Sequence, residues 1–218
     1  MLEKYIEIIK PYIIDLFKDD SSGHDISHLI RVMNIAVKLA EKENGNRLIV
    51  GIAAFMHDIH RIMQNDNGKY FSPKESIPTV RKILDNTDLE ENVKDKICYC
   101  IEYHEEYNWN GNNVDDINTL ILQDADNLDA IGAIGIGRSF TYGGSKNIKM
   151  YDESIPLNLD DDFTDAKDDI TTIHHFYHKL FKLSDNMNTK AAKIQAAERC
   201  NYMRNFVKEF MDEWNGVK

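Results

Sequence analysis

Hydrophobic residues recur along this chain mostly at steps of three and four, the spacing that places them on one face of an α-helix. The first such stripe consists of Leu2, Tyr5, Ile6, Ile9, Ile13 and Leu16. A second predicted helix covers residues 25–40. Residues 48–56 are apolar on every side, which is typical of a helix in the middle of a bundle.

Helix-start signals divide the middle of the chain. Residues 88–91 (Asp-Leu-Glu-Glu) read as a capping box and predict a helix whose apolar stripe ends at Ile101. Residues 72–75 (Ser-Pro-Lys-Glu) predict another start, although Pro78 would kink or restart that helix. Further helices are predicted over residues 117–131, 165–183 and 189–214.

No segment of the sequence alternates apolar and polar residues over the length of a strand, so we predict an all-α fold. Asn and Gly residues mark the expected loops at 44–45, 65–68, 108–113 and 142–147. The sequence contains no internal repeat and no linker. We therefore expect a single-domain helical bundle over residues 1–218, with a motif-bearing core at 20–145 that the helices of 165–214 complete.

The charge balance narrows the range of partners. Lys and Arg total 26 against 37 Asp and Glu, which gives a net charge of −11. Such a surface repels a phosphate backbone, so we expect no binding to nucleic-acid polymers and no docking on an anionic membrane. A small phosphate-bearing substrate stays compatible with this charge, because a bound cation inverts the field inside a pocket.

The cysteine content and the N-terminus indicate the compartment. Three cysteines without a Cys-x-x-Cys pair favour a reducing environment. The N-terminus has no signal-peptide pattern, and the longest apolar run, residues 49–56, is too short to cross a bilayer. We therefore expect a cytoplasmic protein, and a homodimer is compatible with its sequence.

Two histidines stand where burial would be costly. His57 and Asp58 follow directly on the apolar residues 48–56, and burying them requires a partner for each. Hydrogen bonds could satisfy them, or one divalent cation could satisfy both. His28 lies beside the apolar stripe of residues 25–40, where it can point into a groove or be an ordinary half-buried histidine.

A cluster of carboxylates interrupts the predicted helix at 117–131. Asp124, Asp126 and Asp129 stand among apolar residues, where they repel one another unless a counter-charge is present. Asp124 and Asp126 point about 200° apart on a helix, whereas Asp126 and Asp129 share a side. Only one of Asp124 and Asp126 can therefore bind a metal directly, and the other would orient a histidine through a hydrogen bond.

A His, a His-Asp doublet and a distant Asp thus follow one another in apolar helical surroundings, and this combination resembles the HD-domain superfamily of metal-dependent phosphohydrolases. Asp126 matches the family's last Asp because it follows a small residue and precedes a polar residue and a Leu. The resemblance implies the metal ligands His28, His57, Asp58 and Asp126, with Asp124 as the alternative to Asp126.

The chain departs from common members of that family after the doublet, where His60 and Arg61 stand near the position of a further acid. We expect His60 to face solvent, although it could be an extra ligand, and Arg61 could bind a substrate phosphate. The resemblance brings His104 near the pocket as a phosphate contact, a metal contact or a proton carrier. The alternative for His104 is a buried histidine bonded to a carboxylate.

The resemblance also implies the reaction: hydrolysis of a phosphoester or phosphoanhydride bond, with a nucleotide as the substrate class. Imidazole and carboxylate ligands suit Mn, Fe, Co, Ni or Zn, and suit Mg less well. The expected catalytic residues are Asp58, His104 and Asp129. The expected substrate-binding residues are Arg31, Arg61, Arg138, His175 and Lys179.

Two other interpretations stay open. A catalytically inactive HD fold would serve ligand sensing or protein interaction, although the filled ligand positions argue against it. An ordinary helical bundle would satisfy the same polar residues by hydrogen bonds alone. Gly132, Gly135 and Gly137 follow no predicted strand, so they indicate close helix packing and not a dinucleotide-binding loop.

Overall fold

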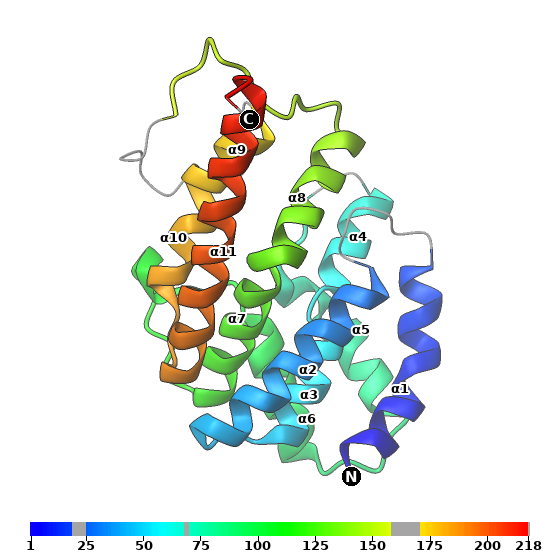
Figure 1. Cartoon of the computed structure of the whole chain (residues 1–218). Coiled ribbons are helices and arrows are strands. Elements are labelled where there is room, and N and C mark those ends of the chain that lie inside the picture. The colour runs from blue at the N-terminus through cyan, green and yellow to red at the C-terminus, as the bar shows by residue number, and fades with distance from the viewer. Residues whose placement is uncertain (19–24, 68–69, 158–170, 218) are drawn as a thin grey trace. The chain divides into compact units, whose positions relative to one another are not determined.

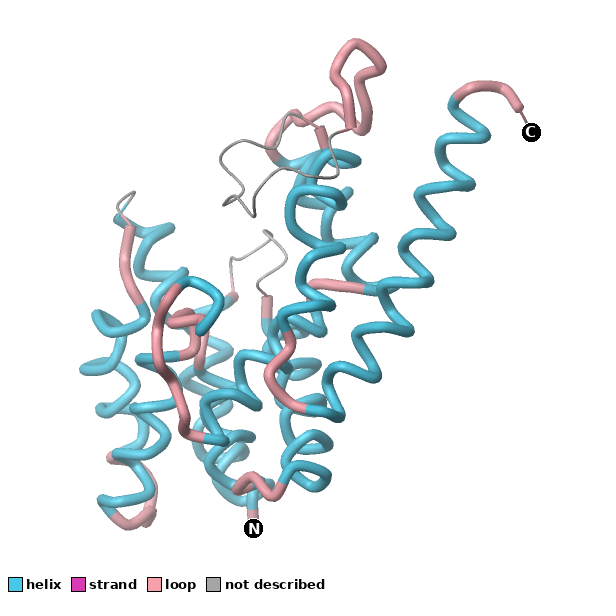
Figure 2. The backbone as a smooth tube through the Cα atoms, turned by 90° about the vertical axis from the view of Figure 1, so that its left-hand side faces the viewer, coloured by secondary structure: helices cyan, strands magenta, loops and turns pink. Residues whose placement is uncertain are grey.

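The computed structural model describes residues 1–18, 25–67, 70–157 and 171–217. Every regular element within these ranges is helical, which confirms the predicted all-α class (Figures 1 and 2). The chain divides into two compact units, Met1–Asp126 and Asn127–Lys218. The expectation of one domain over the whole chain stays a prediction.

The N-terminal unit is built around α3 (Arg47–Met56), whose residues from Ile49 to Met56 are all buried. This confirms the prediction of a central helix, and α1, α2 and α6 pack against it (Figure 1). The other helices of this unit are α1 (Leu2–Phe17), α2 (Ile26–Glu43), α4 (Ile59–Asn67), α5 (Pro73–Leu84), α6 (Glu91–Tyr103) and α7 (Ile117–Asp129), the last of which runs on into the second unit. A short 3-10 turn, η1 (Asn108–Asn110), precedes α7.

Polar side chains define where these helices begin. The carboxylate of Asp25 accepts the backbone N–H of His28 at 2.9 Å and caps α2. The side chain of Asn46 accepts the N–H groups of Leu48 and Ile49 and caps α3. Each cap satisfies donors that the helix itself leaves unpaired, so the start of each helix is encoded locally.

The capping box at residues 72–75 is confirmed, since the Glu75 carboxylate accepts the N–H of Ser72 at 2.7 Å. The helix that follows, α5, continues through Pro78 and does not restart there. The second predicted capping box, at residues 88–91, is wrong. Helix α6 begins at Glu91, and the Asp88 carboxylate is held by Lys4 Nζ at 2.6 Å.

The C-terminal unit holds two long helices, α8 (Gly132–Ser145) and α11 (Lys190–Trp214), which pack together. Between them lie α9 (Thr172–His175), a π-helical turn η3 (Phe176–Leu180), α10 (Phe181–Leu183) and the 3-10 turn η4 (Ser184–Asn186). The predicted helix at 165–183 is matched from residue 172 onward, and its first residues lie outside the described part of the chain. The rings of Phe140, Phe176, Phe206 and Phe210 form an aromatic core in this unit.

Two expected loops are helical instead. Residues 65–67 belong to α4, and residues 142–145 belong to α8, where Gly143 is buried and a Cβ added to it would clash with Thr172 Oγ1. The packing expected of Gly137 is also wrong, since a Cβ there would meet nothing within 4 Å. Gly132 does pack closely: it begins α8 at φ +80° with Arg199 of α11 against it.

Two further features concern membrane-spanning helices and the cysteines. No helix of the described ranges is both long and apolar enough to cross a membrane.

Cys98, Cys100 and Cys200 are free and buried, and burial raises the pKa of Cys100 to about 12. The Cys100 thiol is therefore protonated near neutrality, and the candidate metal donors of the described residues are histidines and carboxylates.

Candidate metal centre

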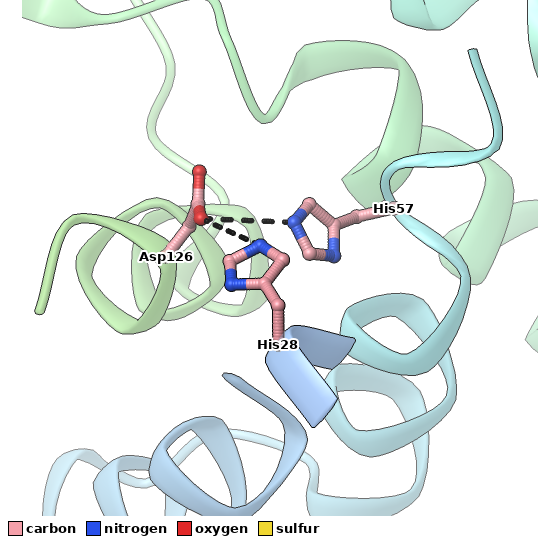
Figure 3. Close-up of side chains that lie close together, drawn as sticks. All are labelled: His28, His57 and Asp126. Atoms are coloured by element: carbon pink, nitrogen blue, oxygen red, sulfur yellow. Dashed lines mark ion pairs between the residues drawn. The ribbon is translucent and has the colours of Figure 1, made fainter. Parts of the chain in front are cut away.

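Three side chains that are distant in the sequence meet inside the N-terminal unit (Figure 3). His28 comes from the first turn of α2, His57 follows the last residue of α3, and Asp126 comes from α7. The Nε2 atoms of His28 and His57 lie 3.4 Å and 3.7 Å from the Asp126 Oδ1 atom. The two rings are buried, with their centroids 5.3 Å apart.

Asp58 turns one carboxylate oxygen toward the same two histidines. Its Oδ2 atom lies 3.3 Å from His28 Nε2 and 3.6 Å from His57 Nε2. Two ligands of one ion, each at a bond length of about 2.1 Å, lie roughly 3.0–3.4 Å apart. The four side chains therefore stand at nearly the separation that a shared cation would require.

The hydrogen bonding of His57 makes its ring ready to receive a cation. The Nδ1 atom lies 2.8 Å from the carbonyl oxygen of Ala54, and because a carbonyl only accepts, Nδ1 carries the hydrogen. The Nε2 atom then offers its lone pair in the neutral ring, and among the described residues it has no hydrogen-bond partner. A buried nitrogen in this state fits a metal ion, which would satisfy it.

His60 and His104 extend the group of buried imidazoles. The ring centroids of His57 and His104 are 5.2 Å apart, and those of His60 and His104 are 5.6 Å apart. The expectation that His60 faces solvent is therefore wrong, because His60 is fully buried. A new helix, α4, begins directly after the doublet at Ile59 and turns the His60 ring inward.

Arg61 is held by two carboxylates of this cluster. Its Nε atom donates to Asp58 Oδ1 at 3.0 Å, and its Nη2 atom donates to Glu105. Asp58 thus uses one oxygen for the guanidinium and presents the other to the histidines. This geometry supports Arg61 as the residue that orients the Asp58 carboxylate, and the predicted contact with a substrate phosphate stays a prediction.

The pKa values of His57 and His104, at the two ends of the cluster, are shifted in opposite directions. Burial disfavours a charged His57 ring, but the carboxylates of Asp58 and Asp126 outweigh this effect and raise the pKa of His57 to about 9. Burial would raise the pKa of Asp126, yet its interaction with the positively charged His57 ring and the neighbouring His28 ring holds this pKa below the usual range. Burial lowers the pKa of His104 to about 4, so that ring is neutral at pH 7.

Glu105 is a residue of this cluster that the sequence reasoning missed. Burial acts to raise its pKa, but His60, His104 and Arg61 together lower it to about 2, so the side chain is an anion. Its Oε1 atom lies 3.5 Å from His60 Nε2. The signal available in the sequence was its position directly after His104, at the end of an apolar helical stripe.

The structure places the remaining predicted site residues on α2, on α7 and in the C-terminal unit. Asp124 is fully buried on α7, and Arg31 is half-buried on α2. Asp129 pairs with Arg138 at 2.9 Å inside the C-terminal unit. His175 ends α9 and Lys179 lies on η3, both half-buried. The roles proposed for these residues stay predictions.

The family model "HD domain" matches residues 25–131. YpgQ of Bacillus subtilis (strain 168), described as an uncharacterized protein, is 31% identical over 98% of this chain and 96% of its own length.

Two solved structures are similar to this chain in both sequence and fold. The crystal structure of an HD-superfamily hydrolase from Bacillus thuringiensis is 37% identical, with a TM-score of 0.74 over 98% of this chain and 97% of that chain. The structure of Bacillus subtilis YpgQ in complex with ADP is 29% identical, with a TM-score of 0.75 over 100% of both chains.

Proposed function

Because this chain belongs to the HD-domain phosphohydrolase superfamily, we propose that it is a metal-dependent hydrolase of a phosphoester or phosphoanhydride bond. The single observation that carries this proposal is the convergence of His28, His57, Asp58 and Asp126 in one buried cluster. Such a set of nitrogen and carboxylate donors suits a divalent transition ion.

His28, His57, Asp58 and Asp126 would hold this ion. When bound, the ion supplies Lewis-acid chemistry, which lowers the pKa of water and withdraws charge from a phosphoryl oxygen. Arg61 keeps the Asp58 carboxylate in its orientation through the bond from its Nε atom. Asp126 lies on the part of the cluster with some exposure, since its side chain is 22% exposed, and a substrate can approach there.

We propose a nucleotide as the substrate class. The support comes from the related YpgQ, whose structure was solved in complex with ADP. Manganese is the ion we would test first, because the set mixes imidazole with carboxylate. Asp129, Arg31, Arg138, His175 and Lys179 stay candidates for proton handling and phosphate contact.

Metal content and product release test this proposal together. The purified chain should contain or take up a divalent ion, and it should release phosphate or pyrophosphate from members of a nucleotide panel supplied with Mn, Mg or Co. The Asp58→Asn variant should lose the ion and the activity while its circular dichroism stays unchanged. The matched control is Asp88→Asn, which removes a carboxylate from an exposed surface pair with Lys4.

The outcomes separate the competing functions. A chain that takes up no ion and stays inert with every cation would contradict the hydrolase proposal. A chain that holds the ion, binds a nucleotide and releases no product would favour the ligand-sensing function instead. Retention of full turnover by Asp58→Asn would show that the cluster is not the active centre.

A further inference from the structure

The guanidinium of Arg61 joins two carboxylates that differ in their relation to the proposed ion. Its Nε atom donates to Asp58 Oδ1 at 3.0 Å, and its Nη2 atom donates to Glu105 Oε1. Asp58 belongs to the proposed ligand set, whereas Glu105 does not. The ligand set therefore leaves the contact between Arg61 and Glu105 without a role.

The way in which Arg61 divides its donors decides what Asp58 can offer. The Nε and Nη2 atoms lie on one edge of the planar guanidinium, and such an edge matches both oxygens of a single carboxylate. Arg61 instead shares this edge between two carboxylates. Asp58 gives it only Oδ1, and Oδ2 lies 3.3 Å from His28 Nε2 and 3.6 Å from His57 Nε2. The Oδ2 atom is thus directed toward the proposed ion.

Glu105 is well suited to engage an arginine. Burial acts to raise its pKa, but His60, His104 and Arg61 together lower this pKa to about 2, so the carboxylate is ionised at neutral pH. A hydrogen bond between two charged groups is stronger than one between neutral groups. The same Oε1 atom lies 3.5 Å from His60 Nε2, which flanks it on a second side.

The backbone around Glu105 is fixed by α7. The buried Gln123 side chain donates to the carbonyl oxygens of Tyr103 and Glu106, each at 3.1 Å. Within this turn the N–H of Tyr107 donates to the carbonyl oxygen of Glu105, also at 3.1 Å. Glu105 is therefore an acceptor held in place, and α7 is also the helix that presents Asp126.

The loss of Glu105 would change what Arg61 does to Asp58. Arg61 is half-buried, and its long side chain would be held by the single bond from Nε. The freed edge could then bind both oxygens of Asp58 and draw Oδ2 away from the histidines. The positive charge of Arg61, no longer balanced by Glu105, would also oppose a cation nearby.

From these contacts we infer that Glu105 is a positioning residue, which engages Nη2 of Arg61 and so keeps Asp58 Oδ2 available to the ion. The inference rests on the proposed function, since the ion is the one proposed above. Glu105 acts through Arg61 and does not bind the ion itself. A phosphate group that approached the same edge of Arg61 would have to displace one of the two carboxylates.

A double-mutant comparison tests the inference without any turnover. The metal-stripped full chain and its variants are titrated with Mn²⁺ by isothermal titration calorimetry. Glu105→Ala should weaken binding at least about tenfold in the parent. In a chain that already carries Arg61→Ala, the further change Glu105→Ala should alter the affinity by no more than about threefold, because the residue through which Glu105 acts is gone.

Three further variants separate the contact from charge and from folding. Glu106→Ala removes an exposed carboxylate at the next position and should bind Mn²⁺ as the parent does. Glu105→Gln keeps an oxygen that can accept from Nη2, so it should retain more affinity than Glu105→Ala. Glu105→Met fills most of the same volume without an acceptor and should match Glu105→Ala. Circular dichroism reports whether each variant is folded.

The visible spectrum of bound Co²⁺ gives a second measurement, because it depends on the geometry of the ligands. This spectrum should change in Glu105→Ala and Glu105→Met, where Asp58 is expected to turn, and stay the same in Glu106→Ala. A residue that only supported the fold would leave the spectrum of the folded variants unchanged.

The other outcomes are distinguishable. Equal losses of affinity with and without Arg61 would overturn the inference, since Glu105 would then act on the ion directly. Unchanged affinity and spectrum in folded Glu105→Ala or Glu105→Met would also overturn it, and the proposed function would stand. A parent chain that binds no ion would remove the proposed function and the inference together.

Discussion

His57 and His104 use their two ring nitrogens for different purposes. In each, Nδ1 donates to the carbonyl oxygen three residues earlier, and Nε2 points into the buried cluster. The first bond selects the ring orientation, so the second nitrogen is positioned before any ion arrives. A substitution that keeps only one nitrogen should therefore lose either the orientation or the ligand.

The choice between Asp124 and Asp126 yields a prediction at this scale. Asp126→Asn should lower the affinity for Mn²⁺ by at least about tenfold, since Asp126 faces both histidines. Asp124→Asn should lower it less, and the comparison is matched because both residues lie on α7. Isothermal titration of Mn²⁺ into the stripped variants measures the difference, and a larger loss in Asp124→Asn would reverse the assignment.

The raised pKa of His57 predicts how pH acts on the metal-free chain. Its folded value of about 9 lies above the ordinary 6.5, so protonation of His57 stabilises the fold. This contribution is fully present below pH 6.5 and is lost as pH rises through about 9. Denaturant unfolding in the presence of a chelator should show the loss, and His57→Gln should flatten this part of the profile.

Metal affinity should follow pH in the opposite direction. A proton and the cation compete for the same His57 nitrogen, so each ion bound displaces a proton. The apparent affinity for Mn²⁺ should therefore rise between pH 6.5 and about 9 and level off above that range. Affinity that falls over this interval would mean that His57 is not a ligand.

At the scale of the elements, the cluster forms where helices end. His57 follows the last residue of α3 and His104 follows the last residue of α6, and these two helices pack together. The last carbonyl groups of a helix lack partners within it and carry partial negative charge. Two such ends near one point favour a bound cation, and each histidine also satisfies one of the carbonyls.

The cap of α3 yields a stability prediction. Asn46→Ala removes the acceptor for the N–H groups of Leu48 and Ile49 and should lower the free energy of unfolding by about 1 kcal/mol. Asn46→Asp keeps an acceptor and should stay close to the parent. Chemical denaturation measures both, and equal midpoints for Asn46→Ala and the parent would show that the cap contributes nothing.

The helices themselves were accessible from sequence because their signals are local. The apolar spacing predicted α1, α2 and α3, and the Ser72 to Glu75 pattern predicted the start of α5. The start of α6 was not predictable in this way. The Asp88 carboxylate pairs with Lys4, which is distant in the sequence, and Glu90 takes the capping position of α6 without a side-chain hydrogen bond. A local capping pattern does not record a tertiary contact of this kind.

At the scale of the whole molecule, the sequence predicted the fold class and the convergence of His28, His57 and Asp126, but not the complete cluster. The ordered motif identified residues that must meet. The inward turn of His60 and the role of Glu105 depend on how α4 and α6 are packed, which no single-residue pattern records. The division of the chain after Asp126 is a further property beyond the motif.

Removing the ion should affect the stability of the chain as a whole. A ligand at a hundred times its dissociation constant stabilises a folded state by about 2.7 kcal/mol. The Tm of the manganese-loaded chain should therefore fall on addition of a chelator, as measured by scanning calorimetry. The Tm of Asp126→Asn should change little when manganese or the chelator is added. The Tm of Asp88→Asn should change as that of the parent does.

The richness of the cluster in imidazole has a consequence for which ion the chain carries. Nitrogen donors bind late first-row ions more tightly than manganese, with copper at the top of that order, whatever the ion used by the enzyme. His28, His57, His60 and His104 cannot reverse this ranking by their chemistry alone. Protein prepared from a zinc- or copper-rich medium would hold those ions. A lack of activity in such a preparation would then reflect the bound ion and not the residues of the protein.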